Sequence, residues 1–533
     1  MSIRINNIFL DLDEPEENLR IKVAKKLRIS LEEINDFRIV KESIDARKKD
    51  LIKFNYSIEV NCNEQKKLLN KLKDKDISFQ DNEEAIDIAF GSKPMINRPI
   101  IVGMGPAGLF AGLIMAKNGY RPIIIERGEP IEQRTNTVNS FWKTGKLNTE
   151  SNVQFGEGGA GTFSDGKLTT RIKDKRCDYI LQEFVKAGAP QEIIYMGKPH
   201  IGTDILKRVV INIRKQIIAY GGEVRFNSRL EGLKVKDGVL NAALVNGEEI
   251  PCENLLLAIG HSSRDTYAML KNVGVTLTPK AFAIGVRVEH TRDLIDKNQY
   301  GIFAEHPKLR AANYKLTFSS EKTKRSAYSF CMCPGGEVVA ASSEEGRLVV
   351  NGMSYYKREL DNSNSAIVVT VGPEDFKDKS SLGGIEFQRH YEKLAYQLGG
   401  GGYIAPVQLV EDFLKDRKSR TLGNVIPSYR PGYELSEIKN CLPEYVVDTL
   451  KEGFVSFDRK IKGFTSSGAV ITGIETRTSA PVRIERNERL ESIDVRGLFP
   501  AGEGAGFAGG IISAAVDGLK CAENIMKEIA PEN

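Results

Sequence analysis

A chain of 533 residues is longer than one hydrophobic core usually organises, so several domains are expected, and 41% hydrophobic with 28% charged residues excludes a fibrous or disordered protein. The 76 basic and 71 acidic side chains are intermixed and leave a net charge of +5, which gives no electrostatic reason to expect nucleic acid or a membrane as a partner. Seven scattered cysteines and a start without the apolar core of a signal peptide predict free thiols and a cytoplasmic location.

Residues 1–95 are predicted to form a small α+β domain. Strand-like "IFLDL" and "FNYSIEV" alternate with helix-like "NLRIKVAKKLR" and "NEQKKLLNKLKDK" (residues 63–75). The turn-rich segment "GSKPMINRP" follows, after which the glycine content rises, so a domain boundary is expected near residue 95.

The rest of the chain predicts an α/β fold with a discontinuous Rossmann-like domain. Residues 96–275 begin with a strand, a glycine turn, a helix and a second strand, and end with short β segments and an apolar strand near 255–259. Residues 462–533 contain a further apolar strand, a glycine-rich turn and a helix. The mixed pattern between them, residues 276–461, is interpreted as an α+β substrate domain.

The segment "IIVGMGPAGLFAGL" has the spacing of a dinucleotide-binding turn. Gly103 is suited to the tight turn, Gly105 to close approach of a pyrophosphate, and Gly108 to close packing of helix on strand. The helix start offers free N–H groups to phosphates. Glu126, at the end of the second strand, is placed to accept hydrogen bonds from a ribose, which argues against a 2′-phosphate there and leaves the adenylate half of NAD or FAD.

A second glycine turn near the C-terminus favours FAD. The strand ending in Ala501, Gly502 and Glu503 precedes a glycine loop and a helix that begins near Gly510. A helix N-terminus aimed at the flavin pyrimidine would stabilise the negative charge that develops on reduction, and an acid just before it could hold the ribityl chain. The alternative is an ordinary glycine-rich turn between a strand and a helix.

Several of these segments together resemble the FAD-binding fold of the glutathione-reductase type: "VGMGPAGLFAGL", "ER" at 126–127, "LLLAIGHSSRD" and "LFPAGEGAGFAGGIISAAVDG". More narrowly, "GEGGAGTFSDGKL" (156–168), "FCMCPGGEVV" and "TRTSAPVRI" are similar to a group of bacterial FAD-dependent dehydrogenases of unestablished substrate. The likeness covers nearly the whole chain.

The resemblance implies a set of FAD contacts. Gly103, Gly105, Pro106, Ala107 and Gly108 would line the pyrophosphate, Glu126 the adenosine ribose, and Arg127 the adenosine edge or a phosphate, and Arg134 would be a phosphate-facing arginine. Gly260 would lie near the cofactor, and Gly502, Gly510 and Ile511 would surround the flavin end. Glu503 stands where the family usually has aspartate, so its ribityl contact departs from the pattern.

The glycine-rich loop at residues 154–171 is interpreted as a second wall of the cofactor site. Gly159, Ala160, Gly161 and Thr162 would lie against FAD, with Ser164 or Lys167 near the flavin ring; the alternative is a flexible loop with a solvated lysine.

Other chemistry-bearing residues stay ambiguous in the sequence. The five histidines (His200, His261, His290, His306, His390) are too dispersed for a metal site, and no metal is expected. Arg477, Arg483 and Arg486, or Tyr429 and Arg430, could hold an anionic substrate or simply lie at the surface. Cys331 and Cys333 are a candidate redox pair, but a turn beside the substrate cavity is the preferred interpretation.

The sequence therefore predicts a FAD-dependent oxidoreductase that transfers a hydride through flavin N5 to or from an unidentified small organic substrate. The glycine run at 398–403 follows no clear strand, so any NAD(P)H would bind transiently over the flavin. The alternatives are a flavin-dependent RNA-modifying protein and a non-catalytic FAD-binding protein. The oligomeric state is not predicted.

Overall fold

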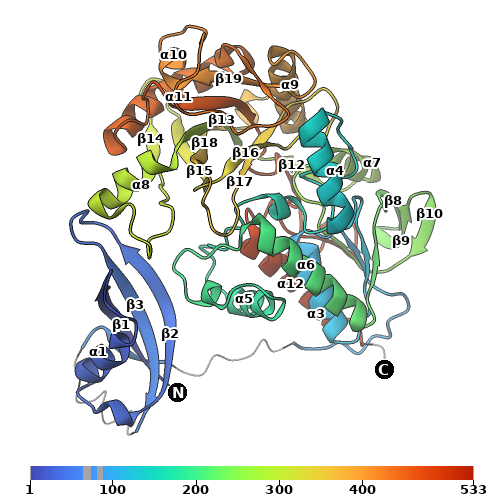
Figure 1. The fold of residues 1–533 in the computed structure, drawn as a ribbon. Helices are drawn as coiled ribbons and strands as arrows, with labels where there is room; N and C mark the ends of the chain where they lie inside the picture. The colour runs from blue at the N-terminus through green and yellow to red at the C-terminus, as the bar shows by residue number, and fades with distance from the viewer. Residues whose placement is uncertain (1, 64–71, 73, 81–87, 532–533) are drawn as a thin grey trace.

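The computed structural model describes residues 2–63, 72, 74–80 and 88–531. In Figure 1 the N-terminal sheet lies at one end of the molecule, apart from two larger sheets. None of the helices in the described part of the chain combines the length and the apolar content that crossing a bilayer requires.

The N-terminal domain is an antiparallel sheet backed by one helix. Its spatial order is β2-β3-β1-β4, with β1 (Ser2–Asp11), α1 (Asn18–Leu27), β2 (Ile34–Asp45), β3 (Lys53–Cys62) and β4 (Ile77–Gln80). Alternate side chains of β1 are buried together with the apolar side of α1, as a one-sided sheet requires. Residues 64–71 and 73 of the helix expected at 63–75 lie outside the described residues. The domain contacts the rest of the chain at the backbone of Glu42, which bonds to Tyr195 and Gly197, and at Asp13 and Glu14, which bond to His306 and Lys308.

A five-stranded parallel sheet forms the centre of the second domain, in the order β23-β11-β5-β6-β7. The strands are β5 (Ile100–Val102), β6 (Ile123–Ile125), β7 (Glu223–Arg225), β11 (Leu255–Leu257) and β23 (Leu498–Pro500). Four of them are wholly apolar and buried, because both faces of a parallel sheet are covered. The C-terminal strand β23 joins a sheet whose first strand, β5, lies about 400 residues earlier in the chain, and helix α12 follows β23. The predicted α/β class with a discontinuous Rossmann-like domain is therefore confirmed.

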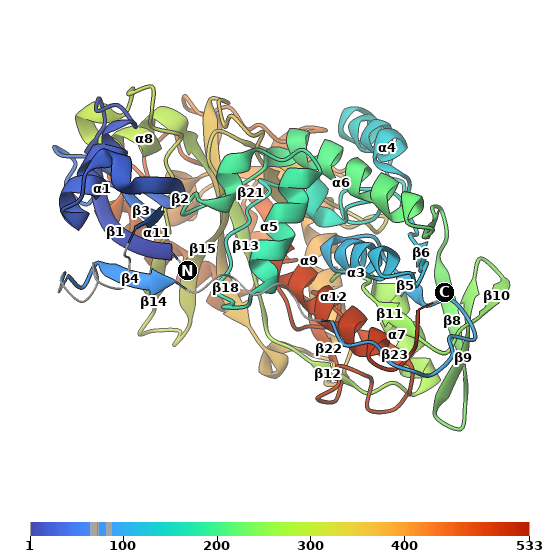
Figure 2. The ribbon, with the colours of Figure 1, turned by 90° about the horizontal axis from the view of Figure 1, so that it is seen from below.

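Helices cover one face of this sheet, as Figure 2 shows for α3, α6 and α12. They are α3 (Pro106–Lys117), α5 (Arg176–Lys186), α6 (Gly202–Ala219) and α12 (Ile511–Met526). The opposite face packs on α7 (Arg264–Val273) and on a small antiparallel sheet of β8 (Leu230–Lys236), β9 (Val239–Val245) and β10 (Glu248–Pro251). Short strands β12 (Leu277–Pro279) and β22 (Val482–Ile484) pair at the border with the next sheet.

A seven-stranded mixed sheet, here called the cap sheet, has the order β14-β15-β18-β13-β21-β19-β20. Its strands are β13 (Phe282–Thr291), β14 (Thr317–Ser319), β15 (Ser326–Cys333), β18 (Asn362–Val371), β19 (Ala405–Leu409), β20 (Tyr433–Leu435) and β21 (Val470–Glu475). The elements around it are α4 (Ile131–Thr144), α8 (Arg292–Tyr300), β16 (Glu337–Ala340), β17 (Val350–Met353), α9 (Gly383–Leu398), α10 (Val410–Leu414) and α11 (Glu444–Lys460).

The cap sheet extends past residue 461, where the sequence analysis placed the end of this region. Strand β21 follows α11 and pairs between β13 and β19, in the middle of the sheet. Its six residues are all buried, so the apolar segment belongs to this core and not to the parallel sheet. The glycine run at 398–403 follows helix α9 instead of a strand, as expected from the sequence.

Candidate dinucleotide and substrate site

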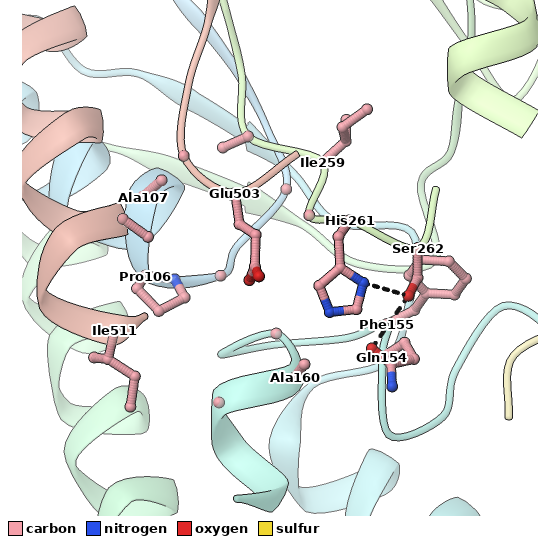
Figure 3. A pocket seen from close by; sticks show the side chains of 18 of the residues that line it. Pro106, Ala107, Gln154, Phe155, Ala160, Ile259, His261, Ser262, Glu503 and Ile511 are labelled. Atoms are coloured by element: carbon pink, nitrogen blue, oxygen red, sulfur yellow. Dashed lines mark hydrogen bonds between the residues drawn. The ribbon is translucent and has the colours of Figure 1, made fainter. Parts of the chain in front are cut away.

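A cavity of about 430 Å³ opens at the carboxyl ends of the parallel strands, which lies within the ~300–1,000 Å³ range of ligand pockets. Residues directly after β5, β6, β11 and β23 line one side of it, and residues of β15, β17 and β21 in the cap line another. Figure 3 shows side chains that follow β5, β11 and β23 converging on the cavity. Open α/β sheets bind ligands at this edge, because the loops after several parallel strands meet there.

The three glycines of the first turn have different physical reasons to be glycine. Gly103 has φ +95°, and a side chain there would also clash with the carbonyl of Ala258. A Cβ on Gly108 would lie 1.9 Å from the carbonyl oxygen of Gly103, so this residue lets helix and strand pack. Gly105 has an ordinary φ of −72°, and its Cβ would meet only the Cα of Gly159, at 3.8 Å. The fold itself does not require Gly105; its missing side chain leaves room in the cavity.

The open space at Gly105, at the start of α3, is here called a glycine cradle. A second glycine cradle lies at the N-terminus of α12. A Cβ on Gly509 would meet nothing within 4 Å, and one on Gly510 would meet only Ser513 Oγ at 3.7 Å. Gly260, after β11, has equally open space at its Cα. Because the first N–H groups of a helix lack partners within it, the starts of α3 and α12 both present donors to the same cavity. These surroundings fit a long, phosphate-containing dinucleotide.

Glu126 joins three loops at the cavity wall. Its carboxylate accepts backbone N–H groups of Met104, Gly128 and Gly156, each at 2.9 Å. Oε1 accepts two of these bonds and Oε2 only one, so Oε2 keeps capacity for a ligand hydroxyl. The neighbouring Arg127 also lines the cavity, with its guanidinium paired to Glu150 and Asp265 and stacked on the ring of Phe155.

Arg134 is buried beneath the cavity, which corrects the expectation that it faces a phosphate. Its side chain is 0% exposed, and its guanidinium donates to the backbone carbonyls of Asn152, Val153, Glu157 and Gly159. Burial lowers the pKa of Arg134 to about 10. The arginine therefore stabilises the glycine-rich loop, because the loop passes over it and the loop's carbonyl groups need hydrogen-bond donors.

Two other predicted residues also lie outside the cavity lining. Thr162 donates its hydroxyl to the Glu157 carbonyl, and its own carbonyl accepts from Thr203, so it stabilises the loop. Gly108 lies at the packing contact described above. The remaining sixteen candidates line one cavity: Gly103, Gly105, Pro106, Ala107, Glu126, Arg127, Gly159, Ala160, Gly161, Ser164, Lys167, Gly260, Gly502, Glu503, Gly510 and Ile511.

Glu503 extends into the cavity from the end of β23 (Figure 3). Burial raises the pKa of its carboxyl to about 7, opposed by the charge of Lys280. Within the described residues, burial and the charge of Lys280 act on this carboxyl, and no hydrogen bond to it is among these influences. A partly buried acid without a protein donor is a group that a ligand hydroxyl could satisfy.

His261 is a cavity residue that the sequence analysis did not assign. Its Nδ1 lies 2.9 Å from Ser262 Oγ, which donates to Gln154 (Figure 3). The same Oγ accepts a hydrogen bond from Arg477. Because the single Ser262 hydrogen goes to Gln154, we assign the imidazole proton to Nδ1, which leaves Nε2 as an acceptor. Burial and the charge of Arg477 lower the pKa of His261 to about 3, so the ring is neutral at pH 7. Its position directly after an apolar strand was the signal that could have identified it.

Arg477 belongs to a buried ion network between the two larger domains. It pairs with Glu392 of α9, and the same carboxylate binds Arg264 at the start of α7. Both arginines and Glu392 are under 9% exposed. Arg477 lines the cavity, but its charge already has a partner.

The other substrate-binding candidates lie away from the cavity lining. Arg486 pairs with Asp517 and stacks on Phe507, and Arg483 also lies over that ring. Tyr429 is buried and donates to the Tyr403 carbonyl. The lining also omits Arg430, His200, His290, His306 and His390.

Cys331 and Cys333 both line the cavity from the end of β15, directly before the Pro-Gly-Gly turn. Lys167 lines it as well and donates to the carbonyl of Met332, between the two cysteines. All seven cysteines are free thiols. Across the described residues, no group of three or more His, Cys, Asp or Glu side chains is arranged to hold a metal ion.

Two segments of the chain match models of protein families. Residues 281–478 match a family model described as "FAD-dependent protein, C-terminal domain-like", and this range contains the cap sheet from β13 to β21. Residues 2–61 match a domain of unknown function. Among solved structures, the chain is similar to CtdE in complex with FAD (12% identity, TM-score 0.32, 82% of this chain and 87% of that chain) and to a glycine oxidase from Bacillus cereus (9%, 0.31, 81% and 98%).

The most informative relative matches nearly end to end. An uncharacterized protein of Clostridium beijerinckii is 62% identical over 528 residues, covering 99% of both chains. This chain therefore belongs to the same protein family as that clostridial protein.

Proposed function

We propose that this protein is a FAD-dependent oxidoreductase acting on a small organic substrate. The observation that carries the proposal is that two open glycine cradles, at Gly105 and at Gly509–Gly510, lie at helix N-termini that open on one cavity. A single dinucleotide with a pyrophosphate and a second electron-rich end would use both of them. The match of the cap to a FAD-dependent model supports FAD as that dinucleotide.

The cavity residues suggest how FAD would lie. The pyrophosphate would approach Gly105 at the start of α3, and the adenosine ribose would bond to Oε2 of Glu126. The adenosine edge would lie beside Arg127 and Phe155. Glu503 would accept from a ribityl hydroxyl, and the start of α12 would face the flavin pyrimidine. When bound, FAD supplies two-electron chemistry at N5.

The cap would hold the substrate over the flavin. Phe330, Asn351, Glu475 and Thr478 line the cavity from the cap sheet and its neighbouring strand β17. This mixture of one aromatic and several polar groups favours a small organic molecule. A nicotinamide donor would have to enter the same cavity, because the glycine run at 398–403 follows a helix.

Reconstitution with FAD tests the proposal directly. The purified protein, incubated with FAD and freed of excess cofactor, should retain one flavin per chain, seen as the visible flavin absorbance band. FMN, which lacks the adenosine half, should bind more weakly because it cannot reach Glu126 and Arg127. A well-folded preparation that stays colourless after this treatment would refute FAD binding.

Anaerobic reduction of the reconstituted protein separates enzyme from binding protein. NADH, NADPH and then candidate organic donors are added in turn, and bleaching of the flavin band is followed. Bleaching by a donor and its reversal by an acceptor support an oxidoreductase. A flavin that is reduced by dithionite but exchanges electrons with none of these compounds favours a structural cofactor.

A further inference from the structure

The cysteine pair, Cys331 and Cys333, lines the cavity proposed to hold the flavin. Cys331 is an exposed residue, and Cys333 is 1% exposed; both are part of the cavity lining. The intervening Met332 is buried in the cap core. The two cysteines therefore face the cavity while the residue between them faces away from it.

A β-bulge in β15 contains the pair. Phe330 is opposite Ala366 and Cys333 is opposite Asn364, so three steps along β15 match two along β18. Within the bulge Cys331 has φ +41°, a left-handed conformation that side chains other than glycine rarely adopt. Strained backbone conformations of this kind gather at functional sites. The bulge also places Cys333 Sγ 3.2 Å from the carbonyl oxygen of Cys331.

Two cations lie against the pair. The buried guanidinium of Arg287 contacts the Cys331 carbonyl at 3.2 Å and Cys333 Sγ at 3.9 Å. Lys167 donates to the Met332 carbonyl. Positive charge near a cysteine favours the thiolate needed for disulfide chemistry. Burial acts in the opposite direction at Cys333 and raises the pKa of its thiol.

The pair lies at the same end of the cavity as the start of α12. A Cβ on Gly161 would lie 3.4 Å from Ile511, the first residue of α12, so the glycine-rich loop touches that helix. Six residues later the same loop reaches the cysteines through Lys167. The same loop meets the adenosine end earlier along the chain, where Gly156 donates to Glu126 and Phe155 stacks on Arg127. The cysteines are thus connected to the end proposed for the flavin ring.

We propose that Cys331 and Cys333 form a dithiol–disulfide couple that exchanges an electron pair with the flavin. The inference rests on the proposed function, because it requires FAD in this cavity. On oxidation both S–H bonds break, one S–S bond forms, and the two protons and the electron pair convert FAD to FADH2. In reverse, the disulfide would take up an electron pair and two protons from the reduced cofactor, and both thiols would be restored. Cys331 is the exposed member of the pair.

Reductive titration of the FAD-loaded protein tests the couple. The protein is first oxidised, then titrated with dithionite without oxygen while the flavin band is followed. The wild type should take up two electron pairs per flavin, one for FAD and one for the disulfide. Cys331→Ser and Cys333→Ser should each take up one. Cys177→Ser, which removes a partly buried thiol of α5 outside the cavity lining, should behave as the wild type.

Mass analysis gives an independent reading that needs no variant. In the oxidised wild type, the peptide containing residues 331–333 should resist alkylation and be lighter by two hydrogens; after titration both sulfurs should alkylate. A bound flavin with uptake of a single electron pair and freely alkylated cysteines would overturn the couple while leaving FAD binding intact. A protein without the flavin band would overturn both.

Discussion

A pair of alanine substitutions separates the cofactor role of the first glycine turn from its structural role. In Gly105→Ala the new Cβ meets only the Cα of Gly159, at an ordinary 3.8 Å, and φ is −72°. Loss of freedom in the unfolded chain raises the free energy of unfolding by about 0.4–1 kcal/mol. Alanine is a poorer N-cap than glycine by a similar amount, about 0.5–1 kcal/mol. The two effects offset, so the free energy should change by less than about 0.5 kcal/mol.

Gly108→Ala is the matched comparison. Its Cβ would lie 1.9 Å from the Gly103 carbonyl oxygen and 3.2 Å from Ile101 Cγ2, so α3 must move away from β5. Overpacking of this kind costs about 1–3 kcal/mol. This variant should lose both stability and FAD, whereas Gly105→Ala should lose FAD alone.

Denaturant unfolding of the FAD-free proteins and FAD titration provide the two measurements. For Gly105→Ala we expect wild-type unfolding and at least a tenfold weaker FAD affinity, about 1.4 kcal/mol, because the methyl group occupies the space proposed for the pyrophosphate. Wild-type FAD affinity in this variant would refute the assignment of the cradle.

Three further predictions follow from the site. Burial raises the pKa of Glu503 from 4.5 to about 7, so the folded protein keeps a proton on this carboxyl at pH values where the unfolded chain has lost it. The contribution of Glu503 to the free energy of unfolding is therefore fully present below pH 4.5 and is lost as the pH rises through about 7. The loss in the free energy of unfolding is at most about 3 kcal/mol. Because glutamine does not titrate, the free energy of unfolding of Glu503→Gln minus that of the wild type should be larger at pH 8 than at pH 5. The same difference at both pH values would contradict this. Arg134→Met should destabilise the FAD-free protein by about 3–5 kcal/mol, because four loop carbonyls lose their donor; unchanged unfolding with weaker FAD binding would instead indicate a direct phosphate contact. His261, whose pKa is lowered to about 3 by burial, should show no NMR titration between pH 5 and 8, and a midpoint near 6.5 would refute its assigned surroundings.

The sequence by itself determined the parallel-sheet domain and most of the candidate cavity. A glycine at a tight turn, an apolar run in a buried strand and an acid at a strand end are local requirements that a few neighbouring residues express. Gly105 and Glu503 could therefore be assigned to one site although nearly 400 residues separate them, because the carboxyl ends of parallel strands meet at one edge.

Only the tertiary structure decided where side chains without such a local signature point. Arg134 could face a phosphate or a loop, and it lies beneath the loop because the carbonyls of residues 152–159 surround its guanidinium. The cysteine pair could form a surface turn, yet both residues line the cavity beside a bulge in β15, and Lys167, 165 positions before Met332, donates to the carbonyl between them. Strand β21 could continue the parallel sheet, but its partners β13 and β19 place it in the cap. Each of these outcomes depends on contacts between distant segments, which no short stretch of sequence specifies.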